Sequence, residues 1–198
     1  MIDKYGFGLS IQTKSNRILR DLDLLKSINR KGKCVVEITL TTFDEELCKI
    51  IEPNVSTTRE RFEVLKTMRD CGIPTIVWLA PTLPFLNDTR ENILGLLHYC
   101  AEAKVYGVIC YGIGMTLRAG NREYYYKKLD EHFPGLKYKY IKMYGDSYMV
   151  TSPKHKELYA LASSFCRENG IVFNAERCFD YIREYTEKPE FEQLSLDL

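Results

Sequence analysis

The sequence predicts an α/β fold: a partial TIM-type (β/α) barrel with four parallel strand–helix units and a C-terminal α+β extension. Three observations lead to this prediction. Short apolar stretches alternate with amphipathic stretches between residues 5 and 133. The stretch 73–80 is apolar throughout, as expected of a strand whose two faces are both covered in a parallel sheet. Four units cannot close an eight-fold barrel, which takes about 250 residues.

The expected elements follow one another in a regular order. The pattern predicts strands at 5–13, 35–41, 73–80 and 105–110, and helices at 17–30, 43–52, 57–72, from Asp88 onward, and at 121–133. The third helix has a capping box, because Thr57 can accept a backbone N–H bond at Glu60 while Glu60 reaches back. Gly72 and Pro74 mark its end.

The regular alternation of strand and helix patterns ends after residue 134. An extended pair or hairpin is expected at 138–149, then a long helix from Ser152 to Gly170 and a short strand at 171–173. The polar tail from Lys188 is expected to fray. We therefore divide the chain into a partial barrel at 1–134 and a C-terminal extension at 135–198 that packs on it, within one structural domain.

Composition limits the class of protein. The chain has 198 residues, 45% of them hydrophobic, and a net charge of +1, so no overall basic field indicates a nucleic-acid or membrane partner. No apolar run approaches the roughly 18 residues needed to span a bilayer. Seven cysteines, mostly inside apolar stretches, are typical of a reduced, cytoplasmic protein.

Ligands gather at the carboxyl ends of parallel strands. Each expected strand is followed by a turn, which we call a corner, and the four corners are candidate sites. They are Thr13-Lys14-Ser15, the threonine-rich stretch 39–42, Ala80-Pro81-Thr82, and 111–114 leading toward Arg118.

Lys14 has two interpretations. It can bind a carboxylate or phosphate as a point charge, or act as an amine nucleophile if burial lowers its pKa; otherwise it is a lysine in a solvated loop. Thr39 and Thr41 carry hydroxyls suited to a ligand, but threonine is also a common strand residue. Gly112 and Gly114 allow a close backbone approach, although the pattern is a weak phosphate motif.

Other chemistries find less support in the sequence. Neither CxxC nor HExxH spacing is present, and the three histidines are scattered. Lysines alternate with tyrosines over 137–148, which suits either a nucleic-acid strip or an edge strand protected from aggregation. We favour the edge strand.

Several sequence segments, which follow one another in a fixed order, resemble those of a known protein family. They are "IQTKSNRILRDLDLL", "VVEITLTTFDEELCKIIEPNVSTTRERFEVLKTMRDCGIPTIVWLAPTLPFLND" and the closing "EQLSLDL". This order is similar to that of radical SAM proteins of the spore photoproduct lyase type, which are often labelled DNA repair photolyases.

The resemblance implies a partial barrel of six βα units whose first loop holds a four-iron four-sulfur cluster on a CxxxCxxC triad. S-adenosylmethionine binds the free iron, and its one-electron cleavage gives a 5′-deoxyadenosyl radical that abstracts hydrogen. The resemblance implies that this chain corresponds to the C-terminal portion of such a protein and begins at the third strand of its barrel. The implied cofactor contacts are Lys14, Ser15, Glu37 and Thr39, and the residues implied to face the substrate cavity are Arg118 and Thr41.

The departure from the family is the missing cluster segment. The chain has no CxxxCxxC triad and no glycine-rich loop before Lys14, so we expect no cluster in this polypeptide alone. The resemblance then leaves an enzyme fragment that works with a separate N-terminal half or as a homodimer. The alternative is a non-catalytic half-barrel that binds a ligand or partner. A self-contained lysine aldolase would need a longer chain.

Overall fold

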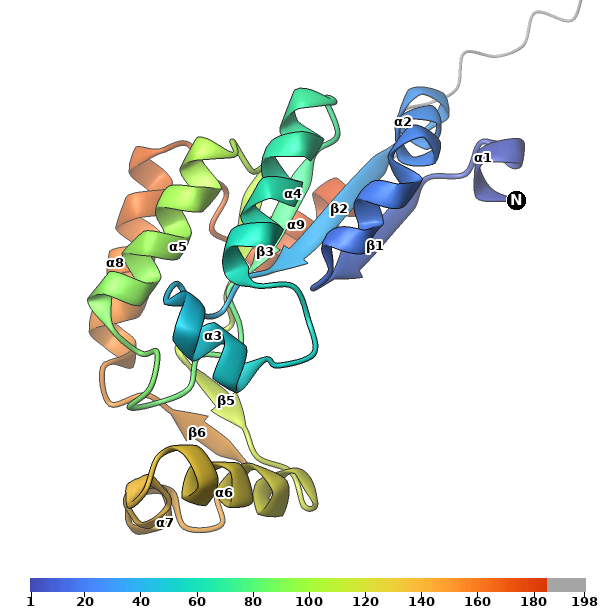
Figure 1. Cartoon of the computed structure of the whole chain (residues 1–198). Coiled ribbons are helices and arrows are strands. Elements are labelled where there is room, and N and C mark those ends of the chain that lie inside the picture. Colours follow the sequence, from blue (N-terminus) through green and yellow to red (C-terminus); the bar gives the residue numbers. More distant parts are fainter. Residues whose placement is uncertain (185–198) are drawn as a thin grey trace, which may run out of the picture.

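The computed structural model describes residues 1–184, which are built around a four-stranded parallel sheet. Neighbouring strands follow in chain order, β1-β2-β3-β4 (Figure 1). Their bounds are β1 Leu9–Thr13, β2 Cys34–Thr39, β3 Thr75–Trp78 and β4 Gly107–Ile109. The predicted α/β class with a parallel sheet is confirmed.

The helices that connect these strands pack on one face of the sheet. They are η1 Asn16–Asp21, α2 Leu22–Lys31, α3 Glu45–Ile51, α4 Thr58–Asp70 and α5 Arg90–Glu102. Helix α8 (His155–Glu168) packs against α5 in the same core, and the two helices lie side by side in Figure 1. Val36, Ile38 and Val77 of the sheet are fully buried in this core. Burial of this apolar face is the main stabilising contribution to the fold.

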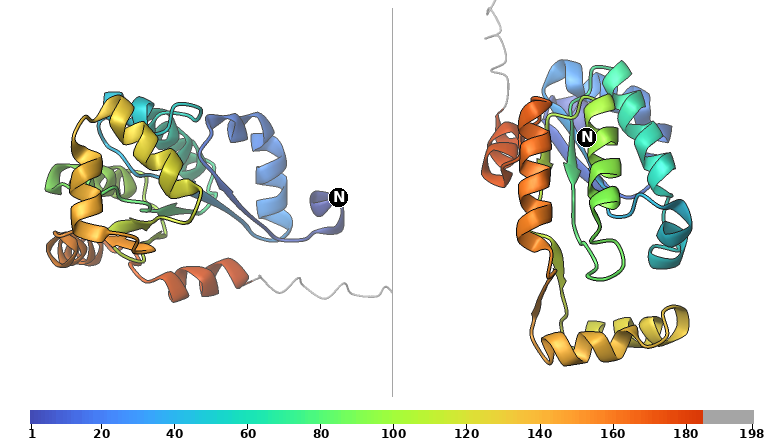
Figure 2. Two further views of the ribbon diagram at one scale, coloured as in Figure 1. Left: turned by 90° about the horizontal axis from the view of Figure 1, so that it is seen from below. Right: turned by 90° about the vertical axis from the view of Figure 1, so that its left-hand side faces the viewer.

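The opposite face of the sheet is covered by a single helix among the described residues, α9 (Ala175–Arg183). In the right-hand view of Figure 2, α9 lies on the other side of the strands from α4 and α5. It packs on Val35, Ile76 and Ile109. Gly107 allows this contact, because a Cβ atom there would lie 2.6 Å from the Cys178 sulfur.

A small module lies beyond the carboxyl ends of the strands (Figure 1). It consists of an antiparallel ribbon of β5 (Gly114–Thr116) and β6 (Met149–Thr151) with helices α6 (Asn121–His132) and α7 (Leu136–Tyr144). Tyr140 is fully buried there, and its hydroxyl donates to the Pro84 carbonyl at 2.6 Å. Gly114 has φ 158°, and a Cβ atom would lie 2.4 Å from the Val150 oxygen, so the ribbon requires glycine at this position.

The prediction of an extended pair or hairpin at 138–149 is wrong, because most of these residues belong to helix α7. Leu136, Tyr140 and Tyr144, four residues apart, belong to one cluster of this module. The edge-strand interpretation of the lysines is therefore also wrong. Lys137 instead pairs with Asp130 at 2.7 Å, and the Lys139 ammonium lies 3.9 Å from the centre of the Phe85 ring.

Smaller differences concern element boundaries. Residues Ile2–Tyr5 form the short helix α1, so the first strand begins at Leu9. Helix α5 is capped by Thr89, and Asp88 accepts a bond from Ser152 at 2.5 Å instead. The expected strand 171–173 is only an isolated bridge of Val172 to Gly107, and α9 was not predicted.

Other expectations hold or fall outside the described part. The capping box of Thr57 and Glu60 is confirmed. No helix within residues 1–184 has the length and apolar character needed to cross a membrane. The tail from Lys188 and the closing "EQLSLDL" phrase lie outside the described residues, as does part of the predicted extension 135–198.

Candidate functional site

Polar side chains gather on the face of the sheet that α9 covers only in part. The strand register places Gln12, Glu37, Thr39 and Trp78 on this face, because parallel partners share a face. Glu37 is 8% exposed; one of its oxygens accepts from Ser10 and the other from the Trp78 indole N–H, both at 2.5 Å. The Gln12 amide donates to the Thr39 hydroxyl at 3.5 Å. Two predicted cofactor contacts, Glu37 and Thr39, therefore share one surface.

An ion-pair network lies at the carboxyl end of β1. The Lys14 ammonium lies 2.5 Å from one Glu52 oxygen, and the Arg61 guanidinium lies 2.6 Å from the other. Thr41 donates its hydroxyl to Glu52 at 3.1 Å. Arg61 also donates to the Thr39 carbonyl at 2.8 Å, so the network joins the ends of β1 and β2.

The charges of this network favour an anion. Burial on its own would raise the pKa of Glu52, but the Arg61 charge and the hydrogen bonds from Lys14 and Arg61 outweigh it and lower that pKa. Glu52 is therefore a carboxylate between two cations, and the corner has one excess positive charge. The Lys14 side chain is 37% exposed, whereas Arg61 is fully buried. An anion would consequently meet Lys14 first.

Sequence reasoning missed Glu52 and Arg61, although one signal for Arg61 was present. Arg61, Leu65 and Met68 are spaced as one stripe of α4, and all three are buried. A charged residue on a buried stripe needs a partner. Which acid would supply that partner was decided only by the fold.

Two predicted site residues have structural roles. Ser15 is the N-cap of η1, and its hydroxyl oxygen accepts the Arg17 N–H at 3.2 Å. Thr41 lies beside Thr42 in a buried network in which Asn87 and Asn92 donate to the Thr41 carbonyl, each at 3.0 Å. These bonds hold the loop after β2 in place.

Arg118 is not brought to this corner. It follows β5, is exposed, and its Nε donates to the Tyr148 hydroxyl at 3.4 Å. No contact among the described residues joins Arg118 to Lys14, Glu37 or Thr39. Its predicted position facing a cavity shared with Lys14 stays a prediction.

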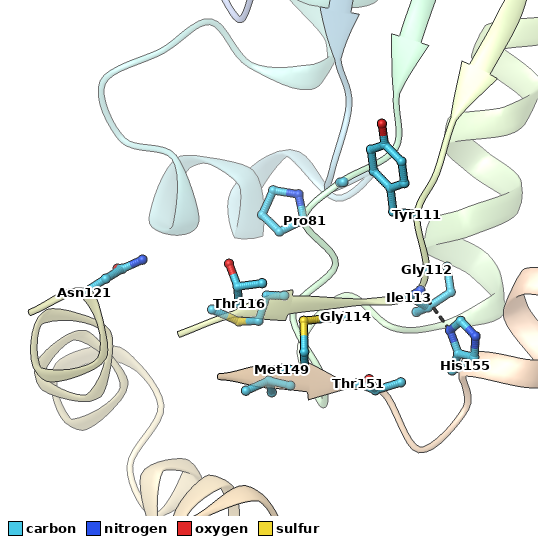
Figure 3. A pocket seen from close by; sticks show the side chains of 13 residues that line it. Pro81, Tyr111, Gly112, Ile113, Gly114, Thr116, Asn121, Met149, Thr151 and His155 are labelled. Atoms are coloured by element: carbon cyan, nitrogen blue, oxygen red, sulfur yellow. Dashed lines mark hydrogen bonds between the residues drawn. The ribbon is translucent and has the colours of Figure 1, made fainter. Parts of the chain in front are cut away.

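A pocket of about 650 Å³ lies between the carboxyl ends of β3 and β4 and the β5–β6 ribbon (Figure 3). The residues after β3 and β4, including Pro81 and Tyr111, form one wall. Met149 of the ribbon and His155 at the start of α8 also line it. The His155 Nδ1 atom accepts the Ile113 N–H at 3.1 Å. Two of the four predicted corners therefore lie at this pocket.

The residues present do not fit an iron–sulfur cluster. All seven cysteines are free, and six of them are buried. Within residues 1–184, no three His, Cys, Asp or Glu side chains are grouped so that they could hold a metal ion. S-adenosylmethionine fits in part, since the partly exposed Lys14 offers a cation for its carboxylate, whereas Glu37 is buried and both its oxygens already accept hydrogen bonds.

Comparison with known proteins finds relatives in bacteria, archaea and a virus. An uncharacterized protein of Mycobacterium tuberculosis is 31% identical over 139 residues, which is 70% of this chain and 40% of that protein. An uncharacterized protein of Methanocaldococcus jannaschii is 33% identical over 133 residues, 67% of this chain and 46% of that protein. One from Acidianus two-tailed virus is 28% identical over 118 residues, 57% and 38% of the two chains.

The chain thus spans less than half the length of these curated relatives. No protein-family model matches the sequence. No solved structure matches it either. Fold and site together define a parallel α/β protein whose candidate ligand site lies at the carboxyl ends of its strands.

Proposed function

We propose that this chain is the C-terminal part of a radical SAM enzyme resembling spore photoproduct lyase, and that its sheet is half of a TIM-type barrel. Strand order supports the barrel, since β1-β2-β3-β4 run in sequence with the connecting helices on one face. A doubly wound sheet would instead reverse its order and carry helices on both faces.

The observation that carries the proposal is the placement of Lys14. Its ammonium lies at the carboxyl end of β1, in a corner with one excess positive charge, next to the strand that carries Glu37 and Thr39. Lys14 binds the carboxylate or ribose of S-adenosylmethionine, and Thr39 and Glu37 provide polar contacts beside it. Held there, S-adenosylmethionine would supply a 5′-deoxyadenosyl radical on one-electron reduction by a cluster, with methionine as the other product.

The cluster itself comes from elsewhere. Strand β1 pairs only with β2 among the described residues, so its outer edge is free for a further strand. An N-terminal half with the CxxxCxxC triad, encoded separately or in frame, provides that strand and the cluster. A second copy of this chain is the alternative occupant of the same edge.

Titration calorimetry with S-adenosylmethionine tests the proposal. One charge-assisted hydrogen bond contributes about 1.5–3 kcal/mol, well below the roughly 8 kcal/mol of micromolar binding. We therefore expect millimolar binding or none for the chain alone, and tighter binding when a segment carrying the CxxxCxxC triad is added.

Substitutions make this test specific. Lys14→Ala should remove about tenfold or more of the gained affinity, which corresponds to roughly 1.4 kcal/mol. Lys128→Ala, at a lysine of α6 that pairs with Glu131, is the matched control and should bind like the parent. If Lys14→Ala also binds like the parent in the presence of the added segment, the site assignment is wrong.

A non-catalytic binding module is the second candidate. The pocket of Figure 3 favours it, because the described residues of this chain form it without the missing cluster segment. The DNA upstream of Met1 distinguishes the two candidates. A segment encoding CxxxCxxC there, in frame or as a neighbouring gene, supports the enzyme, and its absence supports the binding module.

A further inference from the structure

The pocket between the sheet and the β5–β6 ribbon has the size of a small-molecule site. Its volume is about 650 Å³, within the roughly 300–1,000 Å³ range of ligand pockets. The ribbon that closes it is fixed in place: Thr82 N–H donates to the Gly114 carbonyl at 3.0 Å, and Ser152 N–H donates to the Ile113 carbonyl at 2.9 Å. The pocket is therefore largely formed before any ligand binds.

The chemistry of the lining selects against charge. Among the described residues that line the pocket there is no Asp, Glu, Lys or Arg. The Nδ1 atom of His155 is not available to a ligand, because it accepts the Ile113 N–H. An ion that entered would lose hydration without gaining a partner of opposite charge, which is costly.

The side chains around the pocket favour a ring. Tyr111 is 70% exposed at the pocket, with its ring centre 6.2 Å from that of Trp78 (Figure 3 shows Tyr111). Met115 and Met149 line the ribbon side, and Met149 is 59% exposed. Thioethers adapt their shape and make favourable contacts with aromatic rings, and an exposed tyrosine offers a ring face or edge.

One polar group is placed to orient such a ring. The Asn121 side chain lines the pocket from the start of α6 and has no hydrogen-bond partner among the described residues (Figure 3). Its amide offers a donor and an acceptor side by side. We propose that this pocket binds an uncharged aromatic ligand whose ring packs between Tyr111 and the two methionines and whose polar substituent bonds to Asn121.

This inference does not depend on radical chemistry or on Lys14, so it can be tested on the chain as it exists. The five methionines provide the readout in a spectrum of 13C-labelled methyl groups. Met115 and Met149 lie at the pocket, whereas Met68 is in the core and Met143 is exposed on α7. Titration with p-cresol should shift the first two signals through the ring current and leave those of Met1, Met68 and Met143 in place.

Charged analogues of the probe test the selectivity. We expect p-cresol to bind at least tenfold more tightly than 4-methylbenzoate or benzylammonium, and more tightly than cyclohexanol, which lacks the aromatic face. Tyr111→Ala should weaken p-cresol binding at least fivefold, and Met143→Ala should leave it unchanged. Both positions are exposed, so neither variant disturbs the core.

Three outcomes would overturn the inference. They are equal binding of the charged and neutral rings, shifts spread evenly over all five methionine signals, and unchanged binding in Tyr111→Ala. Failure of this test leaves the proposed cofactor contact of Lys14 untouched, because that contact is measured with a different ligand at a different strand end.

Discussion

Replacement of Glu52 by glutamine should destabilise the protein far more than an ordinary surface substitution. The Glu52 side chain is 8% exposed and lies between Lys14 and the fully buried Arg61. Its two oxygens accept from both cations, at 2.5 and 2.6 Å. Glutamine keeps one acceptor oxygen but places an NH2 group against the other cation, and the buried guanidinium loses its counter-charge.

The magnitude follows from the burial of Arg61. Removal of one partner of a buried ion pair costs about 3–5 kcal/mol, because an uncompensated charge stays inside the protein. For a domain of this size, about 2–4 °C in Tm accompanies each kcal/mol, so a fall of roughly 6–20 °C is expected. Lys14→Met should cost less than about 1 kcal/mol, since solvent screens the partly exposed ammonium.

Urea unfolding followed by circular dichroism measures these differences. The matched control is Glu46→Gln, which removes an equivalent charge from an exposed i,i+3 pair with Lys49 and should change the free energy of unfolding by less than about 0.5 kcal/mol. A cost below about 1 kcal/mol for Glu52→Gln would refute the reasoning. It would mean that the Arg61 charge is compensated by its bonds to the Thr39 and Ser56 carbonyls alone.

Three further predictions concern pH, thiols and iron. Because the folded-state pKa of Glu52 is lowered, its stabilisation is fully present above its unfolded pKa of about 4.3 and is lost as the pH falls through the folded value. The stability difference between the parent and Glu52→Gln should thus be constant from about pH 7 to 5 and shrink below about pH 4; a constant difference at lower pH would contradict this sign. In a thiol titration of the native protein at about pH 8, one cysteine should react rapidly, because Cys71 alone is partly exposed and burial raises the pKa of Cys34 and Cys178 to about 11. Cys71→Ser should abolish this fast phase, and its persistence would disprove the assignment. As purified or reconstituted anaerobically, the chain should hold no stoichiometric cluster, and iron and sulfide assays that find about four of each would show that the cysteines assemble differently.

Local sequence patterns determined the sheet and most of its helices. The apolar run 73–80 indicated a strand covered on both faces, and β3 at Thr75–Trp78 is buried over most of its length. The capping box at Thr57 and Glu60 located the start of α4. Such features are local, because they depend on residues within one or two turns of each other.

Where two local patterns competed, tertiary contacts decided. Lysines and tyrosines alternate over 137–142 as in a strand, yet Leu136, Tyr140 and Tyr144 also fit one face of a helix. The buried bond from the Tyr140 hydroxyl to the Pro84 carbonyl, 56 positions away in the sequence, favours the helix. Helix α9 was missed although its local signal was present, since Asn174 caps it and Cys178, Phe179 and Ile182 recur at helical spacing.

The candidate site also has a part that the sequence identified and a part that only the tertiary structure determined. Sequence alone identified Lys14 and Thr39 as residues at strand ends, because parallel strands place their carboxyl ends at one edge, whereas Glu37 was implied only by the family resemblance. It did not determine the charge of the corner, which depends on Glu52, 38 positions from Lys14, and on Arg61 beyond it. An ion pair between distant elements leaves no periodic trace in the sequence, since its energy comes from distance and burial, and only the folded chain determines these.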